Sequence, residues 1–318
     1  MSTKQKNRWS QQSAGLESHK GHRGLVKQRE EVMDQLRNTP VFAVIGDSAA
    51  FGTGDEIKPG EFRGWARILA ENFRDGCEYL NFARPGAKSA EVSTIQLEKA
   101  IANSPDICAV IAGGNDLLRN DFDPVRLYQN LKFACEKLAE IGSEVLMFEL
   151  HDPNRLIKLP KVLKRLLAKR VEAVNHVYRK ISLEFDITFV KTREIQDVHE
   201  LANWHIDRMH PGPKGHFILA RKFSELLRNR GWNIQMPAYI GQIKRSKRQN
   251  RVWLIRNGLP WFLKRSVDLL PAVLILLFIE TLKLIPAKLR GIDLDAIPIF
   301  SEIEGLELPN SISISQAS

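Results

Sequence analysis

The sequence predicts an α/β fold, a three-layer sandwich in which helices cover both faces of a mostly parallel sheet. Short apolar runs rich in β-branched residues alternate along the chain with longer segments of helical periodicity, and this alternation is typical of parallel sheets. Two of the predicted strands, 41–45 and 107–112, end in glycine-rich polar loops. Ligands of open α/β sheets bind beside such loops.

The predicted elements follow one another from Val41 to Trp232. Strands are expected at 41–45, 79–82, 107–112, 145–150 and 187–190. Helices are expected at 65–73, 90–102, 124–141, 155–184 and 215–228. Asp123-Pro124 supplies a cap and a first-turn proline for the third of these helices, and Gly142 ends it. The stretch 193–209 has no clear period and is predicted to be a loop of the active site.

Length and composition predict one main domain with extensions on both sides. With 318 residues and 43% apolar content, the chain is long enough to form one sizeable core. We expect a disordered tail and a lead-in helix over residues 1–40, and the main domain over 41–232. A basic, tryptophan-containing apolar extension over 233–290 and an acidic, serine-rich tail over 291–318 follow.

Charge and cysteine content narrow the class of protein. The net charge of +10 lies mostly in the flanks, and residues 241–290 alone hold eleven Lys and Arg against two Asp and Glu. The main domain is therefore close to neutral, and no nucleic-acid partner is expected. Three cysteines give no disulfide framework, and the polar N-terminus carries no secretory signal. We expect a cytoplasmic protein, with peripheral attachment to the inner membrane face left open.

Ser48 is the first candidate for a reactive residue. It follows the strand 41–45 in the stretch Gly46-Asp47-Ser48, at the sheet edge where ligands bind. From this stretch alone, a nucleophile and a serine that only caps the next helix are about equally well supported.

Three further loops carry candidate site residues, which are Gly86, Asn115, and the pair Asp207 with His210. A serine hydroxyl needs an imidazole base near neutral pH, and that base needs a carboxylate that fixes its tautomer. Asp207 and His210 are three residues apart, which in a helical turn places them on one face. The backbone N–H groups of Ser48 and Gly86, with the Asn115 amide, would supply an oxyanion hole.

Together these residues resemble the SGNH, or GDSL-type, hydrolases. The family's four sequence blocks occur here in order as Gly46-Asp47-Ser48, residues 81–86, Gly113-Gly114-Asn115-Asp116 and Asp207-x-x-His210-Pro211. The resemblance covers about residues 41–231. It implies a flavodoxin-like three-layer sandwich and a serine esterase or lipase, lysophospholipase-like, that hydrolyses ester, thioester or O-acetyl bonds of a small-molecule or lipid substrate.

The resemblance also implies the role of each site residue. Ser48 would be the nucleophile, His210 the base, and Asp207 the residue that orients the base. Ser48, Gly86 and Asn115 would form the oxyanion hole. No metal or organic cofactor is implied, and no His, Cys or Asp cluster of the sequence has metal-ligand spacing.

The sequence departs from the family pattern beside two of these blocks. Ala49-Ala50 stand where many relatives carry a bulkier apolar residue and a hydroxyl residue, and Arg84-Pro85 stand where smaller residues are common. These changes remove no catalytic atom, so we expect activity to be intact, with the acyl pocket and the substrate left open.

Several single residues keep two interpretations. Gly86 is either an oxyanion donor or an ordinary turn glycine, and Arg84 and Lys88 either meet an anionic substrate or are solvated charges. His199 and His205 lie in the same loop as the catalytic pair and are either substrate contacts or without function. We expect His216 to pack or cap the following helix, and Asp47 to tie down the Ser48 loop.

The extension 241–290 also has two interpretations. Basic residues beside Trp253 and Trp261 are typical of an interfacial anchor on an anionic membrane. The apolar run 269–279 is shorter than the roughly twenty residues that span a bilayer, so the segment either binds a membrane surface or packs on the domain or a second copy. A catalytically idle SGNH-fold binding or scaffolding protein that acts through this segment is the alternative to an enzyme. Nucleic-acid binding through 244–251 is a weaker third alternative.

Overall fold

The computed structural model describes residues 39–157, 161–196 and 198–239, with the isolated positions 248, 252, 255, 256 and 260. The chain divides into two units, Met1–Pro40 and Val41–Ser318, and the fold below belongs to the second. The lead-in helix expected within residues 1–40, the acidic tail 291–318 and nearly all of the basic extension 241–290 lie outside the described residues.

A five-stranded parallel sheet forms the centre of the domain. Its strands lie in the order β4 (Glu78–Asn81), β1 (Val41–Gly46), β5 (Ile107–Ile111), β6 (Glu144–Phe148) and β7 (Thr188–Val190). Counted along the chain, this is the flavodoxin-like order 2-1-3-4-5, which has its switch point between β1 and β5. The predicted fold class is confirmed, and the loops after β1 and β5 open at the crevice where such sheets bind ligands.

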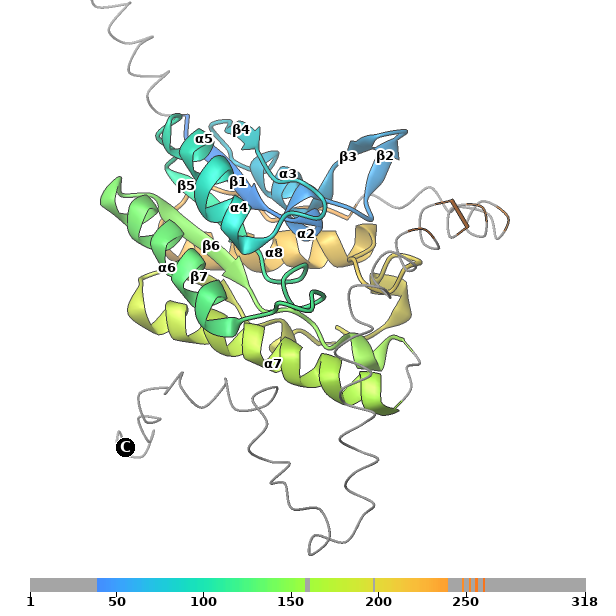
Figure 1. Cartoon of the computed structure of the whole chain (residues 1–318). Helices are drawn as coiled ribbons and strands as arrows, with labels where there is room; N and C mark the ends of the chain where they lie inside the picture. The colour runs from blue at the N-terminus through green and yellow to red at the C-terminus, as the bar shows by residue number, and fades with distance from the viewer. Residues whose placement is uncertain are drawn as a thin grey trace, which may run out of the picture. The chain divides into compact units, whose positions relative to one another are not determined.

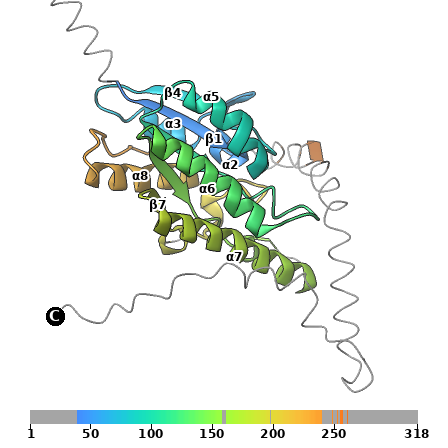
Figure 2. The same ribbon diagram turned by 60° about the vertical axis from the view of Figure 1, so that its left-hand side comes forward.

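Helices cover both faces of this sheet (Figures 1 and 2). Because side chains alternate along a strand, Phe42 and Val44 of β1 enter one core, and Ala43 and Ile45 enter the other. The first core is closed by α3 (Gly64–Ala70) and α8 (Pro213–Asn229). The second is closed by α4 (Ser89–Glu91), η1 (Val92–Gln96), α5 (Leu97–Ile101), α6 (Pro124–Glu140) and α7 (Lys161–Glu184).

The predicted helix boundaries hold best where the capping signals are strong. Asp123 caps α6 by accepting hydrogen bonds from the backbone N–H groups of Val125 and Arg126. By contrast, α3 ends at Ala70, and Phe73 instead forms an isolated antiparallel bridge with Ile234. The helix expected from 155 begins at Lys161, and Arg155 instead ends the short 3-10 helix η2 (Pro153–Arg155).

Two small elements follow β1 that the periodicity did not predict. One is α2 (Ser48–Phe51), and the other is a hairpin of β2 (Glu56–Lys58) and β3 (Glu61–Phe62). Within the described part of the chain, no helix is both long and apolar enough to cross a membrane.

Candidate active site

The nucleophile candidate lies at the start of α2, directly after the end of β1. The carboxylate of Asp47 caps this helix by accepting a hydrogen bond of 2.9 Å from the backbone N–H of Ala49. The indole N–H of Trp65 donates to the carbonyl of Ala49 at 3.1 Å. Ser48 therefore lies on a short helix that Asp47 and Trp65 hold in place. Asp47 ties down the Ser48 loop as expected.

A side chain that sequence reasoning missed fixes the end of β1. Gln96 is buried in η1, which is a π-helical turn between α4 and α5. Its Oε1 accepts from the N–H of Gly46 at 2.6 Å, and its Nε2 donates to the carbonyl of Gly46 at 3.1 Å. π-Helical turns are frequent at functional sites, and this one holds the strand end two residues before Ser48. The expected continuous helix at 90–102 gave no sign of it.

The acid/base block forms a tight hairpin at residues 203–212. His205 N–H donates to the carbonyl of His210 at 2.9 Å, and Gly212 N–H donates to the carbonyl of Asn203 at 2.8 Å. Arg208 at the tip has a φ of 60°, the left-handed region that is uncommon for this residue type. The expectation that Asp207 and His210 share a face of a helical turn is therefore wrong, because the chain reverses direction between them.

Asp207 nevertheless lies beside His210, because its own side chain organises the tip. Asp207 Oδ1 accepts from the backbone N–H groups of Met209 at 2.9 Å and His210 at 3.1 Å. Asx turns of this kind are local substitutes for backbone turns. Asp207 Oδ2 lies 2.8 Å from His210 Nδ1.

Ser48, His210 and Asp207 form one hydrogen-bonded chain across 162 positions of sequence. His210 Nε2 lies 2.7 Å from Ser48 Oγ. With its Nδ1–H donated to Asp207, a neutral His210 presents an unprotonated Nε2 that accepts the Ser48 hydroxyl proton. The three predicted residues are therefore brought together in the geometry of a nucleophile, a base and an orienting carboxylate.

Electrostatics around His210 favour its charged form. Burial would lower the pKa of the His210 imidazole, but the Asp207 carboxylate outweighs burial and, with Asp47, raises this pKa above its usual value. Burial would raise the pKa of Asp207, but the imidazoles of His205 and His210 beside it hold this pKa well below its usual range. Asp207 is thus ionised at neutral pH. Burial raises the pKa of Asp47 to about 6, although its capping hydrogen bond opposes this.

The hairpin packs directly on the nucleophile loop at Gly54. A Cβ atom at this position would lie 2.1 Å from the carbonyl oxygen of Pro211 and 3.2 Å from Cβ of His205. Gly54 also has a φ of +105°, which glycine adopts far more readily than other residues. No side chain fits there, so the two loops that carry Ser48 and His210 meet backbone to backbone.

The oxyanion-hole candidates lie on the loops after β4 and β5, and these loops are bonded to each other. The Asn115 side-chain amide donates to the carbonyl of Ala87 at 3.1 Å, one residue after Gly86. The Asp116 carboxylate accepts from Ser89 N–H at 3.0 Å and from Ser89 Oγ at 2.6 Å. Gly86 has a φ of +87°, and a Cβ atom there would meet nothing within 4 Å, so open space lies beside this backbone.

The remaining histidines take different places. His216 is fully buried: its Nδ1 accepts from Trp65 N–H at 3.2 Å and its Nε2 donates to the carbonyl of Thr53 at 3.0 Å. Burial lowers the pKa of His216 to about 4, and it packs as expected. His151, which was not singled out, packs against Trp204 with ring centroids 3.7 Å apart and the ring planes tilted by 37°. Burial and the charges of His199 and His210 lower the pKa of His151 to about 3.

The two cations beside the glycine block both have acidic neighbours. Arg84 Nε donates to Glu91 Oε1 at 2.8 Å, and Lys88 Nζ lies 3.7 Å from Asp121 Oδ2. Both side chains are exposed, so these contacts favour the interpretation as surface charges. Within the described ranges, no group of His, Cys, Asp and Glu side chains could hold a metal ion.

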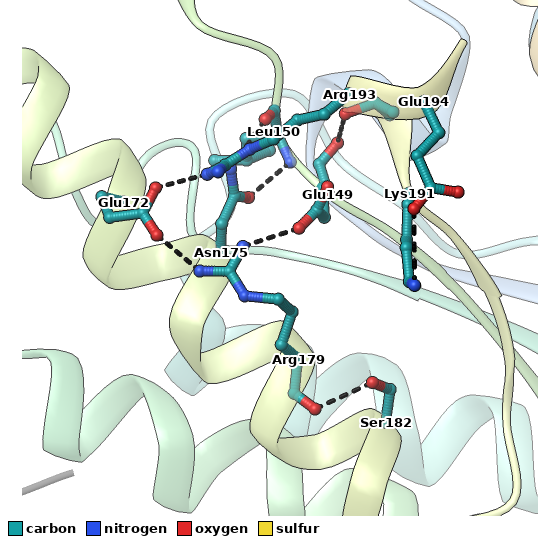
Figure 3. Close-up of polar contacts among 10 residues, drawn as sticks. Glu149, Leu150, Glu172, Asn175, Arg179, Ser182, Lys191, Arg193 and Glu194 are labelled. Carbon is teal, nitrogen blue, oxygen red and sulfur yellow. Dashed lines mark hydrogen bonds and ion pairs between the residues drawn. The ribbon is translucent and has the colours of Figure 1, made fainter. Parts of the chain in front are cut away.

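A chain of charged side chains supports the loop after β6, next to the acid/base hairpin. Glu149, whose side chain is 3% exposed, accepts from Arg179 of α7 at 2.7 Å. Figure 3 shows Glu172 between Arg179 and Arg193, with an ion pair to each. Asn175 bonds both the N–H and the carbonyl of Leu150, at 2.7 and 2.9 Å. The loop is thereby fixed to α7.

Comparison with known proteins identifies the family. A family model described as the GDSL-like lipase/acylhydrolase family matches residues 44–218, which include every site residue above. The chain belongs to this family. Membership in this family makes the protein a hydrolase of ester bonds. No curated protein gives a significant match.

Solved structures of the family are similar to the domain over most of their own length. TesA is 22% identical, with 59% of this chain and 98% of that chain covered and a TM-score of 0.44. A lipolytic protein of the G-D-S-L family from Veillonella parvula is 19% identical over 59% and 98%, with a TM-score of 0.46. The lipase/acylhydrolase from Enterococcus faecalis is 13% identical over 64% and 100%, with a TM-score of 0.48.

Proposed function

We propose that this protein is a serine hydrolase that cleaves carboxylic esters through an acyl-enzyme formed on Ser48. Thioesters and O-acetyl groups require the same chemistry. The observation that carries this proposal is the continuous hydrogen-bonded chain from Ser48 Oγ through His210 to Asp207. A serine that served only as a helix cap would need neither the imidazole nor the carboxylate.

The chain of bonds assigns a role to each residue. His210 Nε2 takes the hydroxyl proton while Ser48 Oγ attacks the carbonyl carbon, and Asp207 stabilises the imidazolium that forms. His210 then gives the proton to the leaving oxygen, which departs with the electron pair of the broken ester bond. Water, activated by His210, hydrolyses the acyl-enzyme by the same route.

The oxyanion of each tetrahedral intermediate requires donors, and three candidates support the proposal. The Ser48 N–H belongs to the first residue of α2, where backbone N–H groups have no partner within the helix. A Cβ atom at Gly86 would meet nothing within 4 Å, and the Asn115 amide has a second N–H besides the one given to Ala87. Loss of one such donor lowers kcat by about a hundredfold or more.

The test is turnover of p-nitrophenyl acetate and butyrate by the wild type, Ser48→Ala and Ser182→Ala. Ser182 donates to the carbonyl of Arg179 on α7 and serves as the matched control. We expect Ser48→Ala to lose at least about a thousandfold in kcat/KM, and a fluorophosphonate probe to label the wild type and Ser182→Ala alone. Equal turnover by the wild type and Ser48→Ala would reject the proposal.

The extension supplies a second proposal, on location. We infer that the basic, tryptophan-bearing segment 241–290 attaches the enzyme to an anionic membrane surface, where it would meet lipid esters. Its eleven basic residues against two acidic ones support this, because each Lys or Arg near an anionic leaflet contributes about 1 kcal/mol.

A further inference from the structure

Asp207 is shared by two imidazoles. Its Oδ2 lies 2.8 Å from His210 Nδ1 and 3.0 Å from Nδ1 of His205. With the two backbone N–H groups on Oδ1, three hydrogen bonds and the ion-pair contact of His205 surround one carboxylate. A triad carboxylate needs one imidazole partner for catalysis, so the second requires its own explanation.

The position of His205 is fixed by the fold. It stands on the entering arm of the acid/base hairpin, and its backbone bonds the carbonyl of His210 and the N–H of Arg208. Its Cβ would be 3.2 Å from any side chain placed at Gly54. Its side chain is 10% exposed, compared with 14% for Asp207. His205 therefore reaches Asp207 from the side of the nucleophile loop, while His210 reaches it from the other arm.

We propose that His205 is a positioning residue for the triad: its imidazole, with Nδ1 at ion-pair distance from Oδ2, holds the Asp207 carboxylate in the orientation that serves His210 and shares the negative charge of Oδ2. This proposal rests on the proposed function. Two imidazoles against one oxygen restrict rotation of the carboxylate more than one imidazole does. They also divide its charge, so His210 keeps less basicity than it would beside an unshared carboxylate.

Other titratable groups lie around the Ser48–His210–Asp207 site and are the same in the wild type and in the His205 variants. They come from the loop after β6, the nucleophile loop and α8, and they are His151, Asp47, Asp55 and His216. None of them is changed in the variants, so a shift in the pH profile reports on His205.

The test uses a matched pair of variants in the full-length protein. His205→Asn keeps an N–H donor at the place of Nδ1, and His205→Leu has a methyl group there. We expect His205→Leu to lower kcat about tenfold with KM within about twofold, because misplaced catalytic groups affect the chemical step. We also expect the acid limb of its kcat/KM profile to move up by about half a pH unit, since Asp207 then serves His210 alone. His205→Asn should recover most of kcat.

Two kinetic results would overturn the proposal: an unchanged kcat and acid limb in His205→Leu, or equal losses in the Leu and Asn variants. The second would mean that size, not the donor, matters at this position. If the variants do not fold, the wild type still decides. In protein labelled with ¹⁵N-histidine we expect two downfield Nδ1–H resonances, and finding His205 protonated only at Nε2 contradicts the proposal. This measurement needs no turnover, so it separates failure here from failure of the esterase assignment, which Ser48→Ala tests.

Discussion

In the proposed mechanism, His210 must be neutral to accept the Ser48 proton. The carboxylates of Asp207 and Asp47 raise its pKa above the usual value against the effect of burial. A base with a raised pKa is a stronger proton acceptor, but a larger fraction of it is protonated at neutral pH. The two carboxylates thus make His210 a stronger base and reduce the fraction of His210 that is neutral at pH 7.

A pH profile follows from this arrangement. We expect kcat/KM for p-nitrophenyl acetate to rise with pH through an apparent pKa above about 6.5, the ordinary value for histidine, and then to level off. Activity is lost as pH falls, since protonated His210 cannot accept the proton. The same profile measured for Asp207→Asn tests the cause: kcat should fall by about 10⁴, and the residual acid limb should move to lower pH. An Asn variant with the wild-type acid limb would contradict the role given to Asp207.

At the scale of elements, α7 supports the active-site edge through a buried ion pair. Glu149 is almost fully buried at the carboxyl end of β6, and Arg179 of α7 is its ion-pair partner. A buried charge that loses its partner costs far more than an exposed one. The network in Figure 3 therefore contains one strong member and several weak ones.

This asymmetry gives a stability prediction. Arg179→Met should lower the free energy of unfolding by about 2–4 kcal/mol, because it leaves Glu149 buried without its guanidinium. Arg193→Met is the matched control, since its partner Glu172 is 50% exposed, and it should cost less than about 1 kcal/mol. Urea denaturation monitored by tryptophan fluorescence measures both. Adding Glu149→Gln to Arg179→Met should recover part of the loss, and equal losses in the two single variants would refute the distinction.

Local pattern explains which elements the sequence predicts well. β1 and β5 are continuous apolar runs, so their positions are correct nearly to the residue. The hairpin β2–β3 has strands of three and two residues, too short for any periodic signal. η1 was missed because its residues have ordinary helical composition, and the bond that Gln96 makes there reaches Gly46, 50 positions away. No local pattern encodes such a contact.

Contacts between residues of the site are likewise only partly predictable from local sequence patterns. Ser48, Asp207 and His210 stand in short motifs with spacing that chemistry can interpret, and the structure joins them. His205 stands in the same stretch of sequence, but nothing in its spacing distinguished a partner of Asp207 from an idle neighbour. The helical turn expected for Asp207 and His210 was wrong for a related reason. Arg208 takes a left-handed conformation that its residue type does not signal.

At the scale of the whole molecule, the site and the net charge belong to different parts of the chain. The site lies within residues 46–216, whereas most of the basic excess lies in the flanks. We therefore expect the proposed catalysis and the proposed membrane attachment to be separable by mutation. Changes in the flank should alter where the enzyme acts and leave the chemistry of Ser48 intact.

A flotation experiment tests that separation. The full-length protein should float with vesicles that contain anionic phospholipid at low salt, and should remain unbound with neutral vesicles. The variant Lys244→Glu, Arg245→Glu, Lys247→Glu, Arg248→Glu should lose most of this binding, and its turnover of soluble p-nitrophenyl acetate should stay within about twofold of wild type. Equal flotation of both proteins would exclude an electrostatic anchor at this segment.

The close approach at Gly54 has a practical consequence. The loop that carries Ser48 and the hairpin that carries His210 meet at Gly54, where there is no room for a side chain. The hydrogen bond between Ser48 and His210 joins the same two segments. A single methyl group at position 54 would act as a wedge at the carbonyl of Pro211. It would move the base away from the nucleophile while every reacting atom stays in the chain. We therefore expect Gly54→Ala to lower kcat for p-nitrophenyl acetate, although it removes no reacting atom.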